Sequence, residues 1–242
     1  MPIKIGTAGW SIAKAEAHKF EVSGSGLQRY ASRFPIVEIN SSFHRSHLPE
    51  TWSRWSDETP DAFRFAVKLP KEITHTRKLR DCSNLVGEFL GEVAHLGPKL
   101  GAVLVQLPPK LEFNSVMCSD VFDQLRTAVD AAIVCEPRHP SWFTPRVDDF
   151  LLAHRVCRAA ADPAIMPSAA VPGGSDDLAY FRLHGSPVIY RSSYADRIEK
   201  IGETLLATSA KSNDVWCVFD NTASSDATQN ALAVLQVIAR ST

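Results

Sequence analysis

Short apolar segments that end in one or two polar residues recur along this chain, and they constrain its fold more than any other feature. One of them begins at Ile133 and runs into Glu136, Arg138 and His139. Eight such segments have the length and the bounding turn residues that are typical of β-strands. We expect strands at residues 3–6, 36–40, 63–68, 102–106, 133–136, 156–161, 178–183 and 215–219.

Apolar residues at helical spacing separate most of the predicted strands, and Leu85, Phe89 and Val93 form one such stripe. Strands that alternate with helices predict parallel βαβ units, and eight repeats in a chain of 242 residues fit a (β/α)8 barrel. We therefore predict an α/β fold in which residues 1–242 form a single TIM-like barrel domain. Residues 164–177 show no periodicity, so an irregular crossover is expected between strands six and seven.

Composition narrows the functional classes. The 26 basic and 27 acidic residues give a formal net charge of −1, so no strong global field attracts nucleic acid or membranes. The five cysteines are odd in number and form no C-x-x-C pair, which indicates neither a disulfide framework nor a zinc knuckle. No apolar run approaches the ~18 residues of a membrane span, and the first residues lack the apolar core of a signal peptide. We expect a cytoplasmic protein with no membrane partner.

In barrels of this kind the active site lies at the C-terminal ends of the strands. The polar residues at the predicted ends are Thr7, Glu38, Asn40, Lys68, Gln106, Glu136, Arg138, His139, Asp162, Arg182, His184, Asp220 and Asn221. Buried polar groups are costly unless they are paired, so a ring of charged groups in an apolar interior favours a functional site. The alternative is that these carboxylates and cations pair with one another and only hold the strands together.

Three residues are candidates for catalysis. Glu38 and Glu136 each follow an apolar strand, where burial is expected to raise a carboxyl pKa toward values useful in general acid/base catalysis. His184 is the third candidate, with the roles of base, metal ligand and structural histidine all open. The alternative for both glutamates is that they neutralise Lys68 or an arginine.

The cationic side chains among the strand ends are expected to bind a phosphate or carboxylate group of a substrate. We assign substrate binding to Asn40, Lys68, Gln106, Arg138, His139, Arg182, Asp220, Asn221, Trp10 and Trp142. The two tryptophans are included because they follow strand ends, where they could form a stacking wall for a sugar or a base. They could equally be lids over the core. His75 follows the third strand and could reach the same place.

A divalent metal ion is a candidate cofactor. Glu136, Asp162, His184 and Asp220 are of the right ligand types. No short spaced motif such as H-E-x-x-H indicates a metal site, so none of these residues is assigned as a ligand and the cofactor stays open.

The chain contains, in this order, the segments GTAGW (6–10), EINSSF (38–43), FRFAVK (63–68), ITH (73–75), VQLPP (105–109), EPRHPSW (136–142), YFRLHG (180–185) and FDN (219–221). Together these segments are specific, and they resemble the YecE-like family of bacterial and archaeal proteins of unassigned function. The resemblance implies a TIM-barrel-like fold and no proven reaction. Two positions depart from it: His44 stands where the family usually has Tyr, and Asp220 where it usually has Asn.

The function that the sequence favours is an enzyme doing acid/base chemistry at the C-terminal mouth of the barrel. Its partner would be a small anionic ligand such as a sugar phosphate or a nucleotide fragment, and its reaction that of a hydrolase, lyase or isomerase. The alternative is a non-catalytic binder of nucleic-acid ends or of a phosphorylated metabolite in the same mouth. The near-neutral charge does not favour the nucleic-acid version. A third alternative is a scaffold whose polar ring only holds the barrel together.

Overall fold

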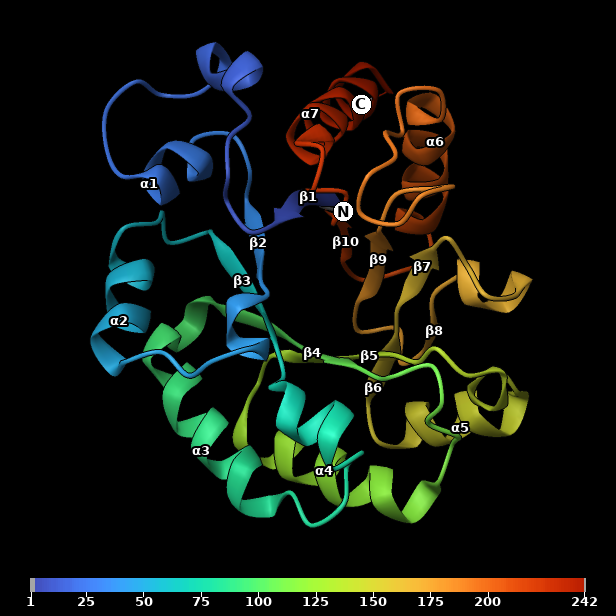
Figure 1. Cartoon of the computed structure of the whole chain (residues 1–242). Coiled ribbons are helices and arrows are strands. Elements are labelled where there is room, and N and C mark those ends of the chain that lie inside the picture. Colours follow the sequence, from blue (N-terminus) through green and yellow to red (C-terminus); the bar gives the residue numbers. More distant parts are fainter. Residues whose placement is uncertain (1–2, 242) are drawn as a thin grey trace.

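A computed structural model describes residues 3–241, and its strands form a single curled sheet (Figure 1). The described residues contain ten strands, in the spatial order β7-β9-β10-β1-β2-β3-β4-β5-β6-β8. The strands are β1 (Ile3–Ala8), β2 (Ile36–Ile39), β3 (Arg64–Lys68), β4 (Leu100–Gln106), β5 (Ala132–Glu136), β6 (Val156–Arg158), β7 (Ala160–Asp162), β8 (Gly173–Gly174), β9 (Ala179–Leu183) and β10 (Val215–Phe219). Neighbouring strands are parallel, except that β8 is antiparallel to β6.

The sheet becomes a nearly closed barrel because one predicted strand changes its neighbours. The predicted strand at 156–161 is divided at Ala159 into β6, which pairs with β5, and β7, which pairs with β9. The chain itself thus joins β6, next to one end of the sheet, to β7 at the other end. When β6 and β7 are counted as one strand, the eight predicted strands are present, with an α-helix in each connection except the one from β7 to β9. The strand count differs from eight because of this division and because of the added two-residue strand β8.

The glycines of β8 explain why a strand forms there. A Cβ at Gly174 would lie 2.4 Å from the carbonyl oxygen of Val156, and the φ of this glycine is +68°. Only glycine combines so close a backbone approach with that conformation at low cost. The segment from 163 to 178 otherwise contains only one short 3₁₀ turn, so the predicted irregular crossover is confirmed.

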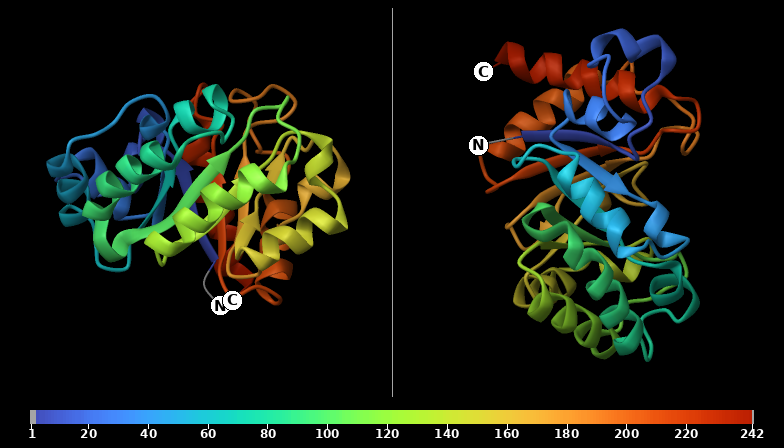
Figure 2. Two further views of the ribbon diagram at one scale, coloured as in Figure 1. Left: turned by 90° about the horizontal axis from the view of Figure 1, so that it is seen from below. Right: turned by 90° about the vertical axis from the view of Figure 1, so that its left-hand side faces the viewer.

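Helices form an outer layer around the strands, as the two views of Figure 2 show. The α-helices of the described residues are α1 (Gly26–Ala31), α2 (Pro49–Asp57), α3 (Ser83–Val93), α4 (Ser115–Ala128), α5 (Pro145–Ala153), α6 (Ile198–Ser209) and α7 (Asp226–Ser241). Shorter helical turns are η1 (Lys14–Lys19), η2 (Ser41–Phe43), η3 (Glu72–Thr76), η4 (Ala94–Lys99), η5 (Pro140–Trp142) and η6 (Pro167–Ala170). None of the helices in the described part of the chain has the length and apolar character needed to cross a membrane.

Local sequence sets where several helices begin. Ser25 and Gln28 form a reciprocal capping box at α1. The side chains of Asn114 and Thr144 accept hydrogen bonds from backbone N–H groups in the first turns of α4 and α5.

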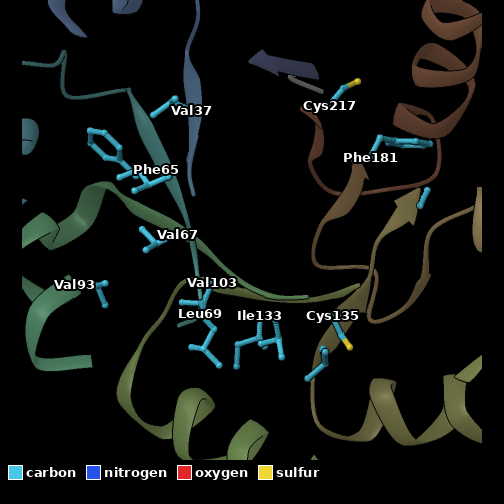
Figure 3. Close-up of a cluster of buried hydrophobic side chains, with 14 of the residues drawn as sticks. Val37, Phe65, Val67, Leu69, Val93, Val103, Ile133, Cys135, Phe181 and Cys217 are labelled. Atoms are coloured by element: carbon cyan, nitrogen blue, oxygen red, sulfur yellow. The ribbon is translucent and has the colours of Figure 1, made fainter. Parts of the chain in front are cut away.

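The larger apolar cluster fills the space between the strands and the helices. Figure 3 shows Val103, Ile133 and Cys135 projecting from β4 and β5 toward the helical layer. A second cluster fills the interior of the barrel and contains Ile36, Ala66, Ala102, Leu104, Val134, Cys157, Ala159, Leu178, Tyr180, Trp216 and Val218. Successive strand residues therefore alternate between the two clusters, as the pleat requires.

The cysteines behave as small apolar side chains. All five are free and buried. Burial raises the pKa of the Cys118 thiol to about 12 and that of the Cys157 thiol to about 11. Thiolate chemistry is therefore disfavoured at these positions.

Candidate functional site

Alternation along the strands gathers polar side chains at one end of the barrel interior. In β2, Ile36 belongs to the inner apolar cluster, and Glu38 points to the same side two residues later. In β9, Tyr180 belongs to the inner cluster, and Arg182 and His184 follow at the same spacing. We call this C-terminal end of the interior the mouth; it is lined by Glu38, Lys68, Gln106, Glu136, Arg182, His184 and Asp220.

Arg182 lies at the centre of the mouth and is fully buried. Its Nε and Nη2 donate to the two carboxylate oxygens of Glu38, at 2.9 and 2.5 Å. Its Nη1 donates to Glu136 at 2.5 Å, and its Nη2 also lies 3.0 Å from Oδ2 of Asp220. The Tyr180 hydroxyl donates to Glu38 Oε2 at 2.9 Å. We call these residues, with His184 and Arg138, the Arg182 cluster.

The contacts of the Arg182 cluster agree with the alternative in which the charged residues at the strand ends pair with one another. A buried cation that meets three carboxylates through hydrogen bonds has its charge compensated in place. The same carboxylates hold the pKa of Arg182 well above its ordinary value, against the burial that would lower it. Arg182 is thus a structural centre rather than a free anion-binding group.

His184 lies between two carboxylates of the cluster. Its Nδ1 is 3.0 Å from Asp220 Oδ2, and its Nε2 is 3.2 Å from Glu136 Oε1. Burial would lower the pKa of this imidazole, but the charge of Glu136 and the hydrogen bonds raise it above the ordinary value. The protonated imidazole can donate from both nitrogens at once, which matches a carboxylate acceptor on each side.

The pKa of Glu136 moves in the direction opposite to the one that the sequence led us to expect. Burial would raise the pKa of this carboxyl group, but Arg182, His184 and Arg138 together hold it well below its usual range. Arg138 Nε donates to Glu136 Oε1 at 2.9 Å. The pKa of Asp220 is lowered for a similar reason, because Arg182 and His184 outweigh its burial. Glu136 is therefore held as a carboxylate and is a poor general acid.

Lys68 differs from the rest of the mouth. It is the last residue of β3 and its side chain is buried, yet none of the described residues accepts a hydrogen bond from its ammonium group. The Nζ instead lies 4.0 Å from the centroid of the Phe43 ring. Burial and the nearby charge of Arg182 lower the pKa of Lys68 to about 8, although Glu38 and the other carboxylates act in the opposite direction.

His75, in η3, extends the mouth next to Lys68. Its ring contacts the Phe43 ring edge-on at 4.9 Å, and burial together with the charges of Lys68 and Arg138 lowers its pKa to about 4. Thr74 Oγ1 lies 2.9 Å from its Nδ1. His75 is therefore neutral at physiological pH, and the prediction that it reaches the mouth agrees with these contacts.

Asn40 and Gln106 lie where the sequence predicted them. Gln106 is buried at the end of β4 and is the register partner of Glu136 in β5. Asn40 follows β2 and is half-buried, and its Oδ1 is buried without a hydrogen-bond partner. An acceptor that lacks a donor in the protein is available to a ligand.

The two predicted tryptophans lie outside the Arg182 cluster. The Trp142 indole is fully buried in the outer apolar cluster and donates to the carbonyl of Leu111 at 2.9 Å. Trp10 packs edge-on against Trp55 at 5.1 Å. For Trp142 in particular, the lid alternative describes the contacts better than a stacking wall.

Two further predicted residues hold local loops. Nδ1 of His139 lies 2.9 Å from the Ser141 hydroxyl and also accepts from the Ser141 backbone N–H, which caps η5. The Asn221 side-chain nitrogen donates to the carbonyl of Ser192 and to Asn230 Oδ1. In the described part of the chain neither residue contacts the Arg182 cluster, although Oδ1 of Asn221, like that of Asn40, is buried without a hydrogen-bond partner.

The four predicted metal-ligand types are divided by the fold. Asp162 points away from the mouth, where Arg197 donates to both of its oxygens at 3.0 and 2.9 Å and the Tyr194 hydroxyl donates at 2.8 Å. Glu136, His184 and Asp220 do come together, but the two carboxylates pair with Arg182, and the His184 imidazole lies between them. Within residues 3–241, no group of three or more His, Cys, Asp or Glu side chains is arranged to hold a metal ion.

Sequence reasoning overlooked Tyr180 as a member of the site. It stands two residues before Arg182, so the same-face spacing that linked Arg182 to His184 could have identified it. Tyr190, in the loop after β9, places its ring edge-on to His184 at 6.0 Å and is 41% exposed. It covers part of the mouth.

The nearly closed and mostly parallel sheet, its helical layer and the polar mouth at the strand C-termini define a TIM-barrel-like α/β protein. The chain belongs to the family described as "Protein of unknown function DUF72", whose sequence profile matches residues 4–242. This membership confirms the family resemblance seen in the sequence and assigns no reaction.

The relatives of the chain lead to the same family. The "UPF0759 protein YecE" of Escherichia coli (strain K12) is 31% identical over 170 residues, a match that covers 70% of this chain and 60% of that relative. The "UPF0759 protein YunF" of Bacillus subtilis is 24% identical over 267 residues, covering 98% of this chain and 94% of the relative. A DUF72 family protein of Enterococcus faecalis superposes with a TM-score of 0.82 at 22% identity, over 98% of this chain and 96% of the other. At this identity the structural similarity shows the fold alone.

Proposed function

We propose that this protein is an enzyme that carries out acid/base chemistry on a small anionic substrate in the mouth of the barrel. The observation that carries the proposal is the contrast between the fully paired Arg182 and Lys68, a largely buried side chain whose amine has no acceptor among the described residues. A purely structural ring would pair this cation as well, because a largely buried charge without a partner costs stability. Groups with perturbed pKa values in a barrel mouth are typical of catalytic sites.

Substrate binding is assigned to the cations that retain free donors. Arg138 uses its Nε and Nη2 for Glu136, and its Nη2 also lies 3.5 Å from His184 Nε2. Its side chain remains 24% exposed, and its Nη1 has no acceptor among the described residues. This Nη1, with protonated Lys68, can hold a phosphate or carboxylate group. A sugar phosphate or a nucleotide fragment has both this anionic group and a carbon skeleton on which a proton can be moved. The unpartnered Oδ1 of Asn40 supplies an acceptor for a substrate hydroxyl.

Proton transfer is assigned to His184 and Lys68. The raised pKa of His184 keeps a proton available for donation, and the lowered pKa of Lys68, about 8, provides neutral amine near physiological pH. Glu136 keeps His184 protonated and oriented. Glu38 has both oxygens occupied by Arg182 and Tyr180, so its role is to fix Arg182 rather than to exchange protons with substrate.

Ligand screening by thermal shift tests the anion-binding half of the proposal. The panel contains inorganic phosphate, ribose 5-phosphate, AMP and short oligonucleotides, each with and without Mg²⁺. A ligand that binds only the folded state raises the unfolding midpoint by mass action. We expect a sugar phosphate or nucleotide to raise the midpoint in the wild type but not in Arg138→Met. Lys71→Met, which removes an exposed lysine, is the matched control and should respond like the wild type.

Turnover separates the enzyme from the non-catalytic binder. Each ligand that shifts the midpoint is incubated with the protein and followed by NMR for new resonances or for exchange of carbon-bound hydrogen with D₂O. New resonances or exchange that disappear in His184→Gln support acid/base chemistry. Binding without product or exchange supports the binder. If no anion raises the midpoint in a way that depends on Arg138, both the enzyme and the non-catalytic binder are contradicted.

A further inference from the structure

Lys68 is placed as a reactive amine rather than as a salt-bridge partner. It occupies an inward position of β3, two residues after Ala66 of the inner apolar cluster, so its side chain enters the mouth. The Phe43 ring lies against the amine at 4.0 Å, and no described residue accepts a hydrogen bond from it. The amine is therefore held in the mouth with its lone pair, when deprotonated, free to attack a ligand.

The surroundings keep part of the Lys68 population neutral. Burial lowers the pKa most, and the charge of Arg182 lowers it further, to about 8. The carboxylates that face Lys68 belong to Glu38, Glu136 and Asp220, and Arg182 occupies all three through direct hydrogen bonds. Burial and an adjacent cation are the two conditions that activate a lysine as a nucleophile.

We propose that Lys68 forms an imine with a small aldehyde or ketone that carries a carboxylate or phosphate group, a substrate class that rests on the proposed anion-binding mouth. The Nζ lone pair forms a C–N bond to the carbonyl carbon, the carbonyl oxygen takes up a proton, and the amine loses one. The resulting carbinolamine then loses its hydroxyl group as water, for which one further proton is needed, and leaves a protonated C=N bond. The reaction consumes no oxidant or reductant.

The neighbours of Lys68 supply what this addition needs. Arg138 holds the anionic group of the ligand. The positive charges of Arg138 and Lys68 both lower the pKa of His75, because both side chains lie near that ring. His184 lines the same mouth and holds a proton between two carboxylates, so we assign to it the delivery of a proton to the oxygen that leaves as water. The Phe43 face closes one side of the amine against solvent.

Borohydride trapping with glyoxylate tests the imine directly. Hydride adds to the imine carbon and a proton to nitrogen, which gives a stable secondary amine that peptide mapping can locate. At pH 7 an amine of pKa about 8 contains on the order of 100-fold more neutral form than an ordinary lysine. Because burial hinders access, we expect Lys68 to be labelled at least about tenfold faster than Lys71, an exposed lysine three residues away.

Two variants and a pH profile make the trapping decisive. In Lys68→Arg the fast label should be lost, while in Lys71→Arg it should remain. If Lys68→Arg does not fold, the wild-type profile decides: labelling of Lys68 that reaches half its maximum near pH 8 supports the proposal, and a rise only near the ordinary pKa of lysine overturns it. Labelling of Lys68 no faster than that of Lys71 overturns it as well.

Different experimental results would contradict the anionic substrate class, the imine and the proposed acid/base function. Equal trapping of acetaldehyde and glyoxylate would contradict the requirement for an anionic group. A sugar phosphate that binds through Arg138 while Lys68 shows no fast trapping would overturn the imine and leave the proposed acid/base function standing. Fast trapping that survives in Arg138→Met, together with no anion-dependent thermal shift, would overturn both the anionic substrate class and the proposed function.

Discussion

Arg182 and Lys68 are two buried cations in the same mouth, and their surroundings differ completely. Arg182 donates hydrogen bonds to Glu38, Glu136 and Asp220 and is fully buried. Lys68 is 9% exposed, faces an aromatic ring and has no acceptor among the residues that the structure describes. Both enter the mouth from inward strand positions, so sequence position alone does not explain the difference.

Arg182 is a cation whose ion pairs stabilise the barrel, whereas Lys68 is a cation that the barrel keeps without an ion-pair partner among the described residues. A buried charge stabilises its surroundings only when partners compensate for its desolvation. Arg182 has such partners, so its pKa rises well above the ordinary value, whereas that of Lys68 falls to about 8. Removing each cation should therefore change the free energy of unfolding in opposite directions.

The largest expected effect is that of Arg182→Met. This change leaves Glu38, Glu136 and Asp220 close together and without their cation, and breaking a buried ion pair on one side costs about 3–5 kcal/mol. Urea unfolding followed by circular dichroism measures the loss. Arg240→Met, which removes an exposed ion pair with Glu199, is the control and should give no resolvable change. Equal effects of the two variants would contradict the central role of Arg182.

Lys68→Met should stabilise the protein at pH 7, by about 1–3 kcal/mol, because it removes a desolvated amine whose pKa is about 8 in the folded state. Below pH 8 the cost of burying the charged form is fully present. As the pH rises from about 8 toward the ordinary lysine value, only the unfolded chain keeps the proton, so wild-type stability rises relative to the variant. Urea unfolding of both proteins at pH 7 and pH 10 measures this convergence. A destabilised Lys68→Met would show that the contact with Phe43 outweighs the desolvation.

Tyr180→Phe isolates one hydrogen bond of the Arg182 cluster. It removes the hydroxyl that donates to Glu38 at 2.9 Å and leaves the ring in the inner apolar cluster. A hydrogen bond to a charged acceptor contributes about 1.5–3 kcal/mol, so a loss of stability near the lower value is expected. Tyr190→Phe, at a partly exposed ring, is the matched control in the same urea assay. A Tyr180→Phe protein as stable as the wild type would mean that Arg182 alone satisfies Glu38.

The smallest effect is a pH dependence from His184. Its pKa is raised in the folded state by Glu136 and by the hydrogen bonds to Asp220 and Glu136, despite burial. The stabilising contribution is therefore complete below the ordinary pKa of about 6.5 and is lost as the pH rises through the higher folded value. The unfolding midpoint of the wild type, measured relative to that of His184→Gln, should decline between pH 6 and pH 9, because the titration of Lys68 is common to both proteins. A relative midpoint that stays constant over this range would contradict this contribution of His184.

Much of the fold and part of the site follow from the sequence. The eight apolar segments predicted the barrel strands, and the absence of periodicity in 164–177 predicted the irregular crossover. Alternation predicted that Glu38, Glu136 and Arg182 would meet, because same-face residues of parallel strands share one end of a barrel. The division of the sixth strand at Ala159 was not predictable, since it depends on which neighbour each half meets.

Residues at the edges of the predicted site show the limit of this reasoning. Asp162 ends β7 as predicted, but its side chain faces outward, where Arg197 and Tyr194 bind it. Trp142 follows a strand end and is nevertheless buried in the outer cluster. A change of direction by one residue moves a side chain to the other face of the sheet, and loop residues have no such periodicity at all.

The sequence by itself determined which side chains could meet in the mouth, because the period of a strand and the direction of parallel strands are local properties. Only the tertiary structure decided how they pair: within residues 3–241 it brought three carboxylates to Arg182 and none within hydrogen-bonding distance of Lys68. Pairing depends on distances between strands that are far apart in the chain, and those distances set the desolvation and the local charge. The pKa of Glu136 therefore fell where sequence reasoning expected it to rise, and Lys68 became the amine that the further experiments address.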